Sequence, residues 1–395
     1  MLDGVKIPLP ILARLSVISV INVIVTGGAG YIGSHVILSL LLTRKFKIIS
    51  IDNYSNSHAE SLERVSKIAR ESLPADASEE DKFSVIIDDR KVDLTNSLAV
   101  REVFEAYGKG NIWGLIHIAA LKAVGESGTV PIEYYRVNVA ATITLLQLMD
   151  EFESHRLVYS SSAAVYGIPS KIPTPETTAL KAKSVYGRTK AISETIIKDI
   201  CQSNPKWRVI SLRYFNPAGA YKSGQIGEHP VGIPENLLPR LAQMAAEQVE
   251  GPVNVFGNEY NTRDGTCVRD YIHVVDLAEG HRLALEALSD GSLQKTFGNV
   301  AGNNVNYKAY NLGTGHGKTV LEVVNVMKEV TNFAYEIKFG NPRAGDAPTL
   351  TADPALAKTE LGFSASSDLE RICRDLWNWQ AKNPAGYGTQ RAQRS

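Results

Sequence analysis

The chain has 395 residues, of which 44% are hydrophobic and 21% charged, so it is long enough for two domains and has the composition of neither a disordered chain nor a membrane protein. Its 42 lysine and arginine residues balance its 42 aspartate and glutamate residues, which argues against binding to nucleic acid or to a membrane surface. Cys201, Cys267 and Cys373 lie far apart without CxxC spacing, so we expect no disulfide framework, no metal site and a cytoplasmic location.

The N-terminal segment contains an apolar stretch, Ile11 to Val25, that is too short to span a bilayer and is interrupted by Arg14 and Asn22. It lacks the small-residue cleavage site of a signal peptide. We interpret the end of this stretch as a strand and residues 1–20 as an extension of unknown role. A surface appendage, a weak hydrophobic signal and a gene-model error remain open for it.

Strands and helices are predicted to alternate from residue 22 to residue 214, which is the pattern of an α/β fold with a doubly wound parallel sheet. The predicted strands are Asn22–Thr26, Lys47–Ile51, Phe83–Ile87, Ile112–Ile118, Arg156–Ser160 and Arg208–Tyr214. The predicted helices include one through Val36, Leu40 and Leu41, and then Leu98–Ala106, Pro131–Glu153 and Ser184–Gln202.

The regular alternation stops at Asn216, where Gly, Pro and Asn become frequent. We therefore expect a first domain over residues 21–215 and a smaller, irregular α/β domain over residues 216–387. A helix at Val275–Leu288 and a strand at Tyr310–Leu312 fit either domain, so a return of residues 275–315 to the first sheet is left open.

A glycine-rich turn follows the first strand. It contains Gly27 and the pattern Gly28-x-Gly30-x-x-Gly33, which is weak alone but here lies between an apolar strand and an apolar-periodic helix. In a Rossmann fold such a turn lets the helix N-terminus hold a pyrophosphate. Asp52 closes the second strand, where a carboxylate accepts hydrogen bonds from both ribose hydroxyls and repels a 2′-phosphate. The sequence therefore predicts NAD rather than NADP.

Tyr186 and Lys190 lie four residues apart on a predicted helix and therefore share one face, and Ser162 ends the preceding serine-rich strand. A tyrosine hydroxyl, with a pKa of about 10, is a poor base at neutral pH, but a neighbouring ammonium and the positive charge of bound NAD both favour the phenolate. We predict Tyr186 as the catalytic base, with Lys190 and Ser162 as its partners. A half-buried tyrosine beside a solvated lysine is the alternative for the motif alone.

Ten ordered motifs resemble the extended short-chain dehydrogenase/reductase family and, within it, the sugar-nucleotide 4-epimerases. They are TGGAGYIGSH (26–35), DNYSNS (52–57), HIAALKAVGES (117–127), SSSAAVYG (160–167), YGRTK (186–190), RYFNPAGA (213–220), GIPENLLP (232–239), DGTCVRDYIHV (264–274), YNLGTG (310–315) and PRAGD (342–346). The resemblance implies a Rossmann NAD-binding domain, a UDP-sugar domain and a homodimer formed through paired helices, including the helix of Tyr186.

Dehydratases, decarboxylases and reductases of this family share the fold and the Tyr/Lys pair. The dehydratases carry carboxylates after the serine strand, where this chain has Ala163 and Ala164. The resemblance therefore implies reversible conversion of UDP-glucose to UDP-galactose through a 4-keto sugar, with NAD held tightly, as in galactose metabolism. Leu350 replaces a bulky tyrosine of bacterial members, so UDP-GlcNAc and UDP-GalNAc are expected as additional substrates. A non-catalytic NAD-binding regulator is the second hypothesis.

The resemblance also assigns site residues position by position, and it makes His35 and His117 packing residues. Around NAD it places Tyr31, Ile32, Asp52, Asn53, Tyr54, Ser55, Asn56, Ser57, Asp93, Leu94, Ile118, Ala119, Ala120, Leu121, Lys122, Asn138, Ser162, Tyr186, Lys190 and Phe215. Around the UDP-sugar it places Lys122, Ser162, Tyr186, Asn216, Asn236, Leu237, Asn254, Val255, Phe256, Arg269, Arg343, Asp346 and Leu350. The guanidinium forks of the two arginines suit a diphosphate.

Overall fold

A parallel sheet of seven strands forms the centre of the computed structural model, which describes residues 21–388 apart from 233, 235, 293–295, 299–305 and 344. The extension assigned to residues 1–20 lies outside the described residues. The sheet order is β3-β2-β1-β4-β5-β6-β11, and every pairing is parallel. The strands are β1 (Ile21–Thr26), β2 (Phe46–Asp52), β3 (Asp88–Lys91), β4 (Gly114–His117), β5 (Arg156–Ser162), β6 (Arg208–Tyr214) and β11 (Tyr307–Leu312).

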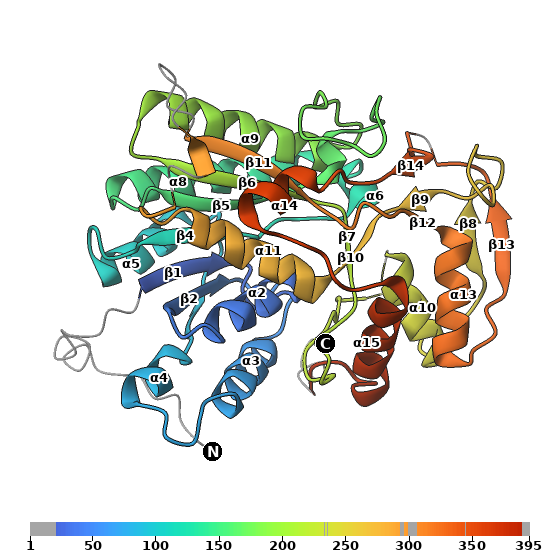
Figure 1. Cartoon of the computed structure of the whole chain (residues 1–395), viewed down its shortest axis with the longest axis horizontal. Helices are drawn as coiled ribbons and strands as arrows, with labels where there is room; N and C mark the ends of the chain where they lie inside the picture. The colour runs from blue at the N-terminus through green and yellow to red at the C-terminus, as the bar shows by residue number, and fades with distance from the viewer. Residues whose placement is uncertain are drawn as a thin grey trace.

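Helices cover both faces of this sheet (Figure 1). One face packs against α2 (Tyr31–Leu41), α3 (Ala59–Glu71), α11 (Val274–Ala287) and α14 (Ala355–Leu361). The other packs against α5 (Ser97–Tyr107), α8 (Ala141–Glu151) and α9 (Val185–Ser203). The order of the strands reverses between β1 and β4, and ligands of such sheets bind outside the carboxyl ends of the strands at this point. The predicted doubly wound fold is confirmed.

One predicted strand is wrong. Residues assigned to Phe83–Ile87 begin inside a helix, α4 (Glu79–Ser84), and the strand is β3. Ser78 and Asp81 form a capping box and the first turn of α4 is acidic, which stabilises a helix there. β3 is an edge strand of four charged residues, so it lacks the apolar pattern by which a buried strand is recognised.

The helix predicted over Pro131–Glu153 forms in three consecutive parts. These are α7 (Pro131–Tyr135), a π-helical turn η1 (Arg136–Ala140) and α8. A π-turn adds a residue to the helical repeat and is frequent at functional sites. It changes the direction of the side chain of Asn138, one of the predicted cofactor-binding residues.

Apart from α11, β11 and α14, most of the chain beyond residue 216 forms small sheets and helices beside the large sheet, on the right of Figure 1. An apolar cluster joins α10 (Leu237–Ala245), α13 (Val320–Thr331), α15 (Leu369–Lys382) and β8 (Val253–Phe256). The remaining short elements are α6 (Val124–Ser127), η2 (Ala163–Val165), β7 (Asn216–Ala218), β9 (Val268–Arg269), β10 (Tyr271–His273), β12 (Lys318–Thr319), β13 (Ile337–Gly340) and β14 (Thr349–Leu350). Because β11 lies beside β6 in the large sheet, the domain division at residue 216 stays a prediction.

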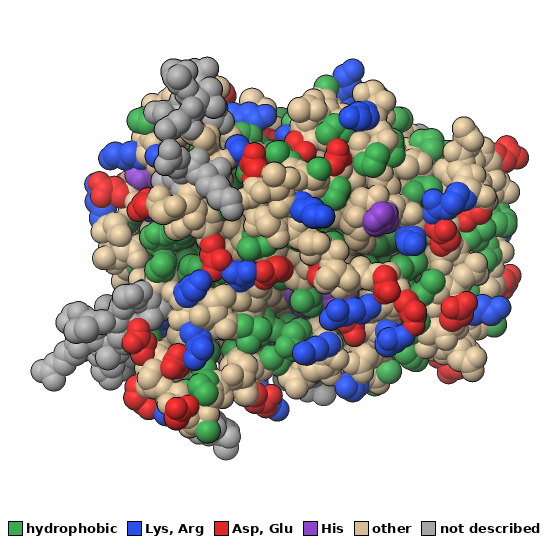
Figure 2. Space-filling model, viewed as in Figure 1, with side chains coloured by type: hydrophobic (Ala, Val, Ile, Leu, Met, Phe, Trp, Pro, Cys, Tyr) green, Lys and Arg blue, Asp and Glu red, His purple; other side chains and the backbone are tan. Residues whose placement is uncertain are grey.

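The surface carries both signs of charge, interspersed over the face seen in Figure 2, in keeping with the balanced composition. Among the described residues no helix combines the length and the apolar character needed to cross a membrane. The three cysteines are buried and form no disulfide bonds.

Candidate active site

The glycine turn between β1 and α2 is closely packed. Gly27 has a φ of +70°, and a Cβ there would lie 2.9 Å from the backbone nitrogen of Ala119. A Cβ at Gly33 would lie 2.0 Å from the carbonyl oxygen of Gly27. Real Cβ atoms do not approach so closely, so this conformation of the turn requires glycine at both positions.

Gly30 precedes α2 and has no side chain with which to cap it, so the N–H groups of the first turn at Tyr31 and Ile32 find no acceptor within the helix. These N–H groups and the helix dipole favour an anion. Together with the packed glycines, they form a cradle that fits the pyrophosphate of a dinucleotide. The residues present therefore fit NAD.

Asp52 ends β2 and links this turn to the following loop. Its Oδ2 accepts a hydrogen bond of 3.1 Å from the N–H of Ala29, and its Oδ1 accepts from the N–H of Tyr54 (2.9 Å) and the hydroxyl of Ser57 (2.7 Å). Each carboxylate oxygen accepts two hydrogen bonds, so Oδ2 retains one free acceptor position for a ribose hydroxyl. Asp52 thus fixes the conformation of the predicted cofactor loop and also presents a negative charge to the cofactor.

The rest of the predicted cofactor residues follow the carboxyl ends of neighbouring strands. Asn53 donates from Nδ2 to Oδ2 of Asp93 after β3 at 3.0 Å. After β4, the N–H of Leu121 donates to Oδ1 of Asn138 (2.8 Å), whose Nδ2 donates to the carbonyl of Leu121 (2.9 Å). The π-turn therefore fixes the segment 118–122 through Asn138. The structure brings the predicted cofactor residues together along one edge of the sheet, at 27–33, 52–57, 93–94, 118–122, 138, 162, 186, 190 and 215.

The two histidines near the site are neutral packing residues. His117 lies between the hydroxyls of Thr26 (2.7 Å) and Thr142 (2.9 Å), and burial lowers its pKa to about 3. His35 Nδ1 donates to the carbonyl of Tyr31 at 2.8 Å, and burial lowers its pKa to about 4. Neither ring is a protonated imidazolium at neutral pH, so neither serves as a general acid.

Ser162, Tyr186 and Lys190 meet where β5 ends against α9. Tyr186 and Lys190 are buried one helical turn apart, and the Lys190 ammonium donates to the carbonyl of Ser160 at 2.7 Å. The hydroxyl of Ser162 accepts from the N–H of Ala164 (3.2 Å) and lies close enough to Tyr186 to lower the pKa of its hydroxyl. The predicted catalytic residues therefore form one cluster.

The electrostatics of this cluster differ from the sequence prediction. Burial raises the pKa of Tyr186 above its ordinary value, and the hydrogen bond from Ser162 and the ammonium of Lys122 oppose this rise. The ammonium that favours the phenolate of Tyr186 is thus that of Lys122. The sequence predicted that Lys190 would have this effect. Burial lowers the pKa of Lys190 to about 7, against the raising effect of Glu194. Burial therefore disfavours the charged forms of both Tyr186 and Lys190.

Sequence reasoning missed a buried ion pair behind α9. Glu194 accepts from Arg213 at both carboxylate oxygens (Nε 2.9 Å, Nη2 2.6 Å), from the hydroxyl of Ser161 (2.6 Å) and from that of Tyr307 (3.0 Å). Glu194 lies four residues after Lys190 on the face shared with Tyr186. That spacing is the signal in the sequence that could have identified it.

The predicted substrate residues form two groups, the first around Arg269 on β9 and the second around Phe256 on β8. Arg269 on β9 pairs with Asp346 and donates to the carbonyl of Ala347 at 2.8 Å. The guanidinium of Arg343 lies 4.0 Å from the centre of the Phe256 ring, which is a cation–π contact. Val255 points into the apolar core and Leu237 packs against it, while Asn236 precedes α10 and Asn254 is exposed on β8.

A second residue missed by sequence reasoning supports the first group. Asp270 is fully buried and accepts from the N–H groups of Thr314 (2.8 Å), Gly315 (2.9 Å) and Ala352 (3.1 Å). Nδ2 of Asn216 donates to the backbone carbonyl of Asp270 at 3.2 Å. The carboxylate thus fixes β14 beside β9, where Leu350 is in register with Arg269 and packs against a cluster that contains Phe215.

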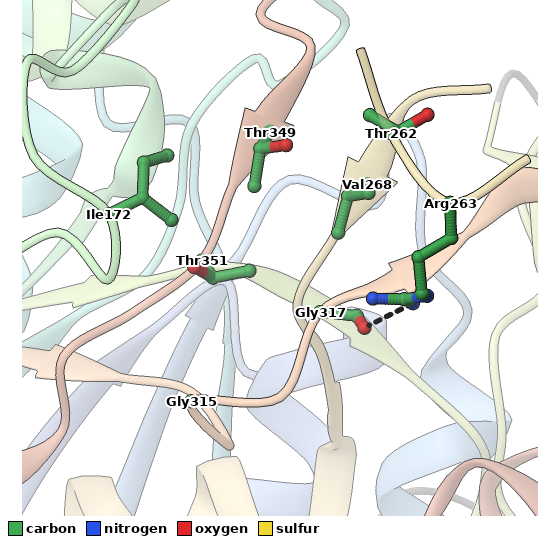
Figure 3. A pocket seen from close by; sticks show the side chains of 8 residues that line it. All are labelled: Ile172, Thr262, Arg263, Val268, Gly315, Gly317, Thr349 and Thr351. Carbon is green, nitrogen blue, oxygen red and sulfur yellow. Dashed lines mark hydrogen bonds between the residues drawn. The ribbon is translucent and has the colours of Figure 1, made fainter. Parts of the chain in front are cut away.

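A cavity of about 260 Å³ lies on the opposite face of β9 and β14 from these residues (Figure 3). Val268 and Thr349 line it, and each directly precedes a predicted substrate residue. Because successive side chains of a strand point to opposite faces, Arg269 and Leu350 point away from the cavity. Arg263 crosses its edge and donates to the carbonyl of Gly317 at 3.0 Å. The cavity is separate from the predicted site.

Comparisons with known proteins give consistent results. The family model described as GDP-mannose 4,6 dehydratase matches residues 24–376. UDP-glucose 4-epimerases of Dictyostelium discoideum and Homo sapiens are 45% and 42% identical, and the alignments cover 93% of this chain and 97% and 99% of theirs. A crystal structure of UDP-glucose 4-epimerase from Bifidobacterium longum in complex with NAD+ and UDP has a TM-score of 0.81 and 38% identity, covering 92% of this chain and 99% of that one.

Proposed function

We propose a function from one premise: the chain belongs to the GDP-mannose 4,6 dehydratase family and, within it, to the UDP-glucose 4-epimerases. It interconverts UDP-glucose and UDP-galactose by oxidation and reduction at C4, with NAD as cofactor. The observation that carries this conclusion is the cluster of Ser162, Tyr186 and Lys190 beside a glycine cradle, with alanines at 163 and 164. This site offers a base for a hydroxyl proton and lacks the carboxylates that elimination of water needs.

Bound NAD supplies the acceptor and the donor of the C4 hydride. In its phenolate form Tyr186 takes the proton of the C4 hydroxyl, and as the phenol it later returns that proton to the C4 oxygen. Ser162 lies beside Tyr186 and lowers its pKa. Lys190, held by the carbonyl of Ser160, gains charge as Tyr186 loses its proton, because a phenolate one turn away favours the ammonium. The burial of both groups keeps water from the proton that is exchanged.

The binding assignments remain our proposals. The cradle of Gly27, Gly30 and Gly33 holds the pyrophosphate of NAD, and Asp52 holds its adenosine ribose. On the other side of the site, Arg269 and Arg343 bind the diphosphate of the UDP-sugar, which supplies the anionic partner that both guanidiniums prefer. The alternative, a non-catalytic NAD-binding regulator, is not favoured, since it gives no role to the buried Tyr186 and Lys190.

The test is turnover of UDP-galactose to UDP-glucose by protein purified without added cofactor. Wild type should be active, and Tyr186→Phe should lose about 1,000-fold in kcat while retaining NAD. Tyr335→Phe is the matched control, because its hydroxyl also makes a protein hydrogen bond, to the carbonyl of Leu241 at 3.0 Å, but lies outside the cluster. A Tyr186→Phe enzyme as active as this control would refute the assignment.

We propose a homodimer formed through the helices on the α9 side of the sheet. Leu98 on α5 and Ile132 on α7 are 71% and 78% exposed, and Ile143 on α8 and Ile192 on α9 are also exposed. α5 packs against α8, and α7 packs against α9, so the four side chains belong to adjoining helices. Ile132→Glu should shift the mass measured by light scattering from two chains to one. A wild-type mass of one chain would refute the proposal.

We also propose a cytoplasmic location and no nucleic-acid partner. The three cysteines carry no disulfide, which suits a reducing compartment, and the formal net charge is zero. Cell fractionation and a binding assay with DNA at low salt would check the two statements.

A further inference from the structure

Lys122 reaches from the cofactor edge of the sheet to a carboxylate that no sequence motif identified. Its Nζ lies 2.8 Å from Oε1 of Glu228. The Glu228 side chain is 6% exposed and that of Lys122 is 48% exposed. The backbone next to Lys122 is fixed by the two hydrogen bonds between Leu121 and Asn138. The side chain of Lys122 is therefore held at both ends, at the backbone and at the ammonium.

The segment around Glu228 is itself fixed on two sides. On one side, the indole N–H of Trp379 on α15 donates to the carbonyl of Glu228 at 3.0 Å. On the other, the N–H of Val231 donates to Oδ1 of Asn56 in the cofactor loop at 2.9 Å. Glu228 thus bridges the C-terminal helix and the cofactor edge, and its position does not depend on a flexible loop.

A lysine side chain has four rotatable bonds, so an ammonium in solvent samples many positions. A buried carboxylate 2.8 Å away restricts it to one. Leu121, the residue before Lys122, packs against the apolar cluster that contains Tyr186, so the side chain of Lys122 starts beside the proposed base. An ammonium opposes the rise in the pKa of Tyr186 to a degree that varies with its distance from the hydroxyl. The contact with Glu228 therefore determines how strongly the proposed base feels the ammonium.

We propose that Glu228 is a positioning residue for the reaction, holding the ammonium of Lys122 beside Tyr186. The inference rests on the proposed function and extends it to a residue outside the predicted site. Glu228 touches neither substrate nor cofactor in this account. Its effect passes through Lys122, so replacing Glu228 should have no further consequence once Lys122 is gone.

The kinetic test is a double-mutant cycle of Glu228→Gln and Lys122→Met on UDP-galactose turnover. Each single variant should lose about 10-fold in kcat, and the double variant should equal Lys122→Met. The KM of Glu228→Gln should change less than about 3-fold. In Glu228→Gln, bound NAD and thermal stability should match wild type. Losses that multiply in the double variant, or wild-type kcat in Glu228→Gln, would overturn the proposal. A fall in stability and NAD content that parallels the fall in kcat would also overturn it.

A second test needs no turnover and so separates this proposal from the proposed function. The rate at which an amine-reactive acylating reagent modifies Lys122 is measured by peptide mass spectrometry. Glu228→Gln should raise this rate about 5-fold, because a lost carboxylate favours the reactive neutral amine. Glu360→Gln is the matched control. Because Glu360 pairs with Lys308, this variant should change only the rate at which the reagent modifies Lys308. An unchanged rate at Lys122 would refute the tether, whereas inactive wild type would refute only the proposed function.

Discussion

Replacing Arg213 by methionine should destabilise the protein through Glu194. In the folded chain the Glu194 side chain is 0% exposed and that of Arg213 is 3% exposed. The substitution removes both guanidinium hydrogen bonds to the carboxylate and leaves Glu194 with Ser161 and Tyr307 as donors. Removing one partner of a buried ion pair costs about 3–5 kcal/mol in the free energy of unfolding, because the other charge stays buried.

The pH dependence gives the sign of this effect. In wild type burial raises the pKa of Glu194, but the hydrogen bonds and the charge of Arg213, together with the hydrogen bonds from Ser161 and Tyr307, outweigh burial and lower it. A depressed folded pKa contributes stability at neutral pH that is lost as the pH falls through that pKa. In Arg213→Met burial dominates, so the folded pKa lies above the unfolded value. The variant then loses stability as pH rises, and its deficit relative to wild type is larger at pH 7 than at pH 5.

The assay is urea unfolding followed by tryptophan fluorescence at both pH values. The control is Glu194→Gln combined with Arg213→Met, which removes the stranded charge and should recover part of the lost stability at pH 7. A deficit below about 1 kcal/mol, or an equal deficit at pH 5 and pH 7, would refute the reasoning. It would mean that water reaches Glu194 in the folded protein.

Three further predictions concern the ligand sites. Gly33→Ala places a Cβ 2.0 Å from the carbonyl oxygen of Gly27, so we expect little NAD in an extract of the purified variant. Full NAD content would show that the turn can change its conformation without losing the cofactor. Asp52→Ala removes the charge that repels a 2′-phosphate, so NADP binding measured by calorimetry should strengthen relative to NAD, and an unchanged ratio would contradict the assigned role. Wild type should convert both UDP-GalNAc and UDP-galactose, and Leu350→Tyr should convert only UDP-galactose. Failure of wild type on UDP-GalNAc would contradict the idea that the smaller Leu350 admits the N-acetyl group.

Local patterns predicted the elements that carry the site. The turn at 27–33, the helix of Tyr186 and Lys190, and the strands on either side depend on interactions between residues close in sequence. The strand predicted at Phe83–Ile87 failed because a capping box outweighed a short apolar run. The π-turn at Asn138 gave no signal, since a single extra residue in a helical repeat leaves the apolar pattern nearly unchanged.

The residues that support the site could not be predicted in the same way. Arg213, Asp270 and Glu228 are charged, and a charged residue in a sequence is normally exposed. Their burial depends on partners between 19 and 106 residues away, such as Glu194 for Arg213 and Lys122 for Glu228. Only the three-dimensional arrangement shows that Arg213 and Glu228 are paired with opposite charges and that backbone N–H groups satisfy Asp270.

The central claim is that the hydrogen removed from C4 returns to the same carbon. The most direct measurement is NMR of the UDP-galactose formed from UDP-glucose deuterated at C4, in ordinary water and without added cofactor. The account predicts that the deuterium stays at C4 of the product. Replacement of the deuterium by solvent hydrogen would contradict the account, because it would show that C4 exchanges with water during the reaction.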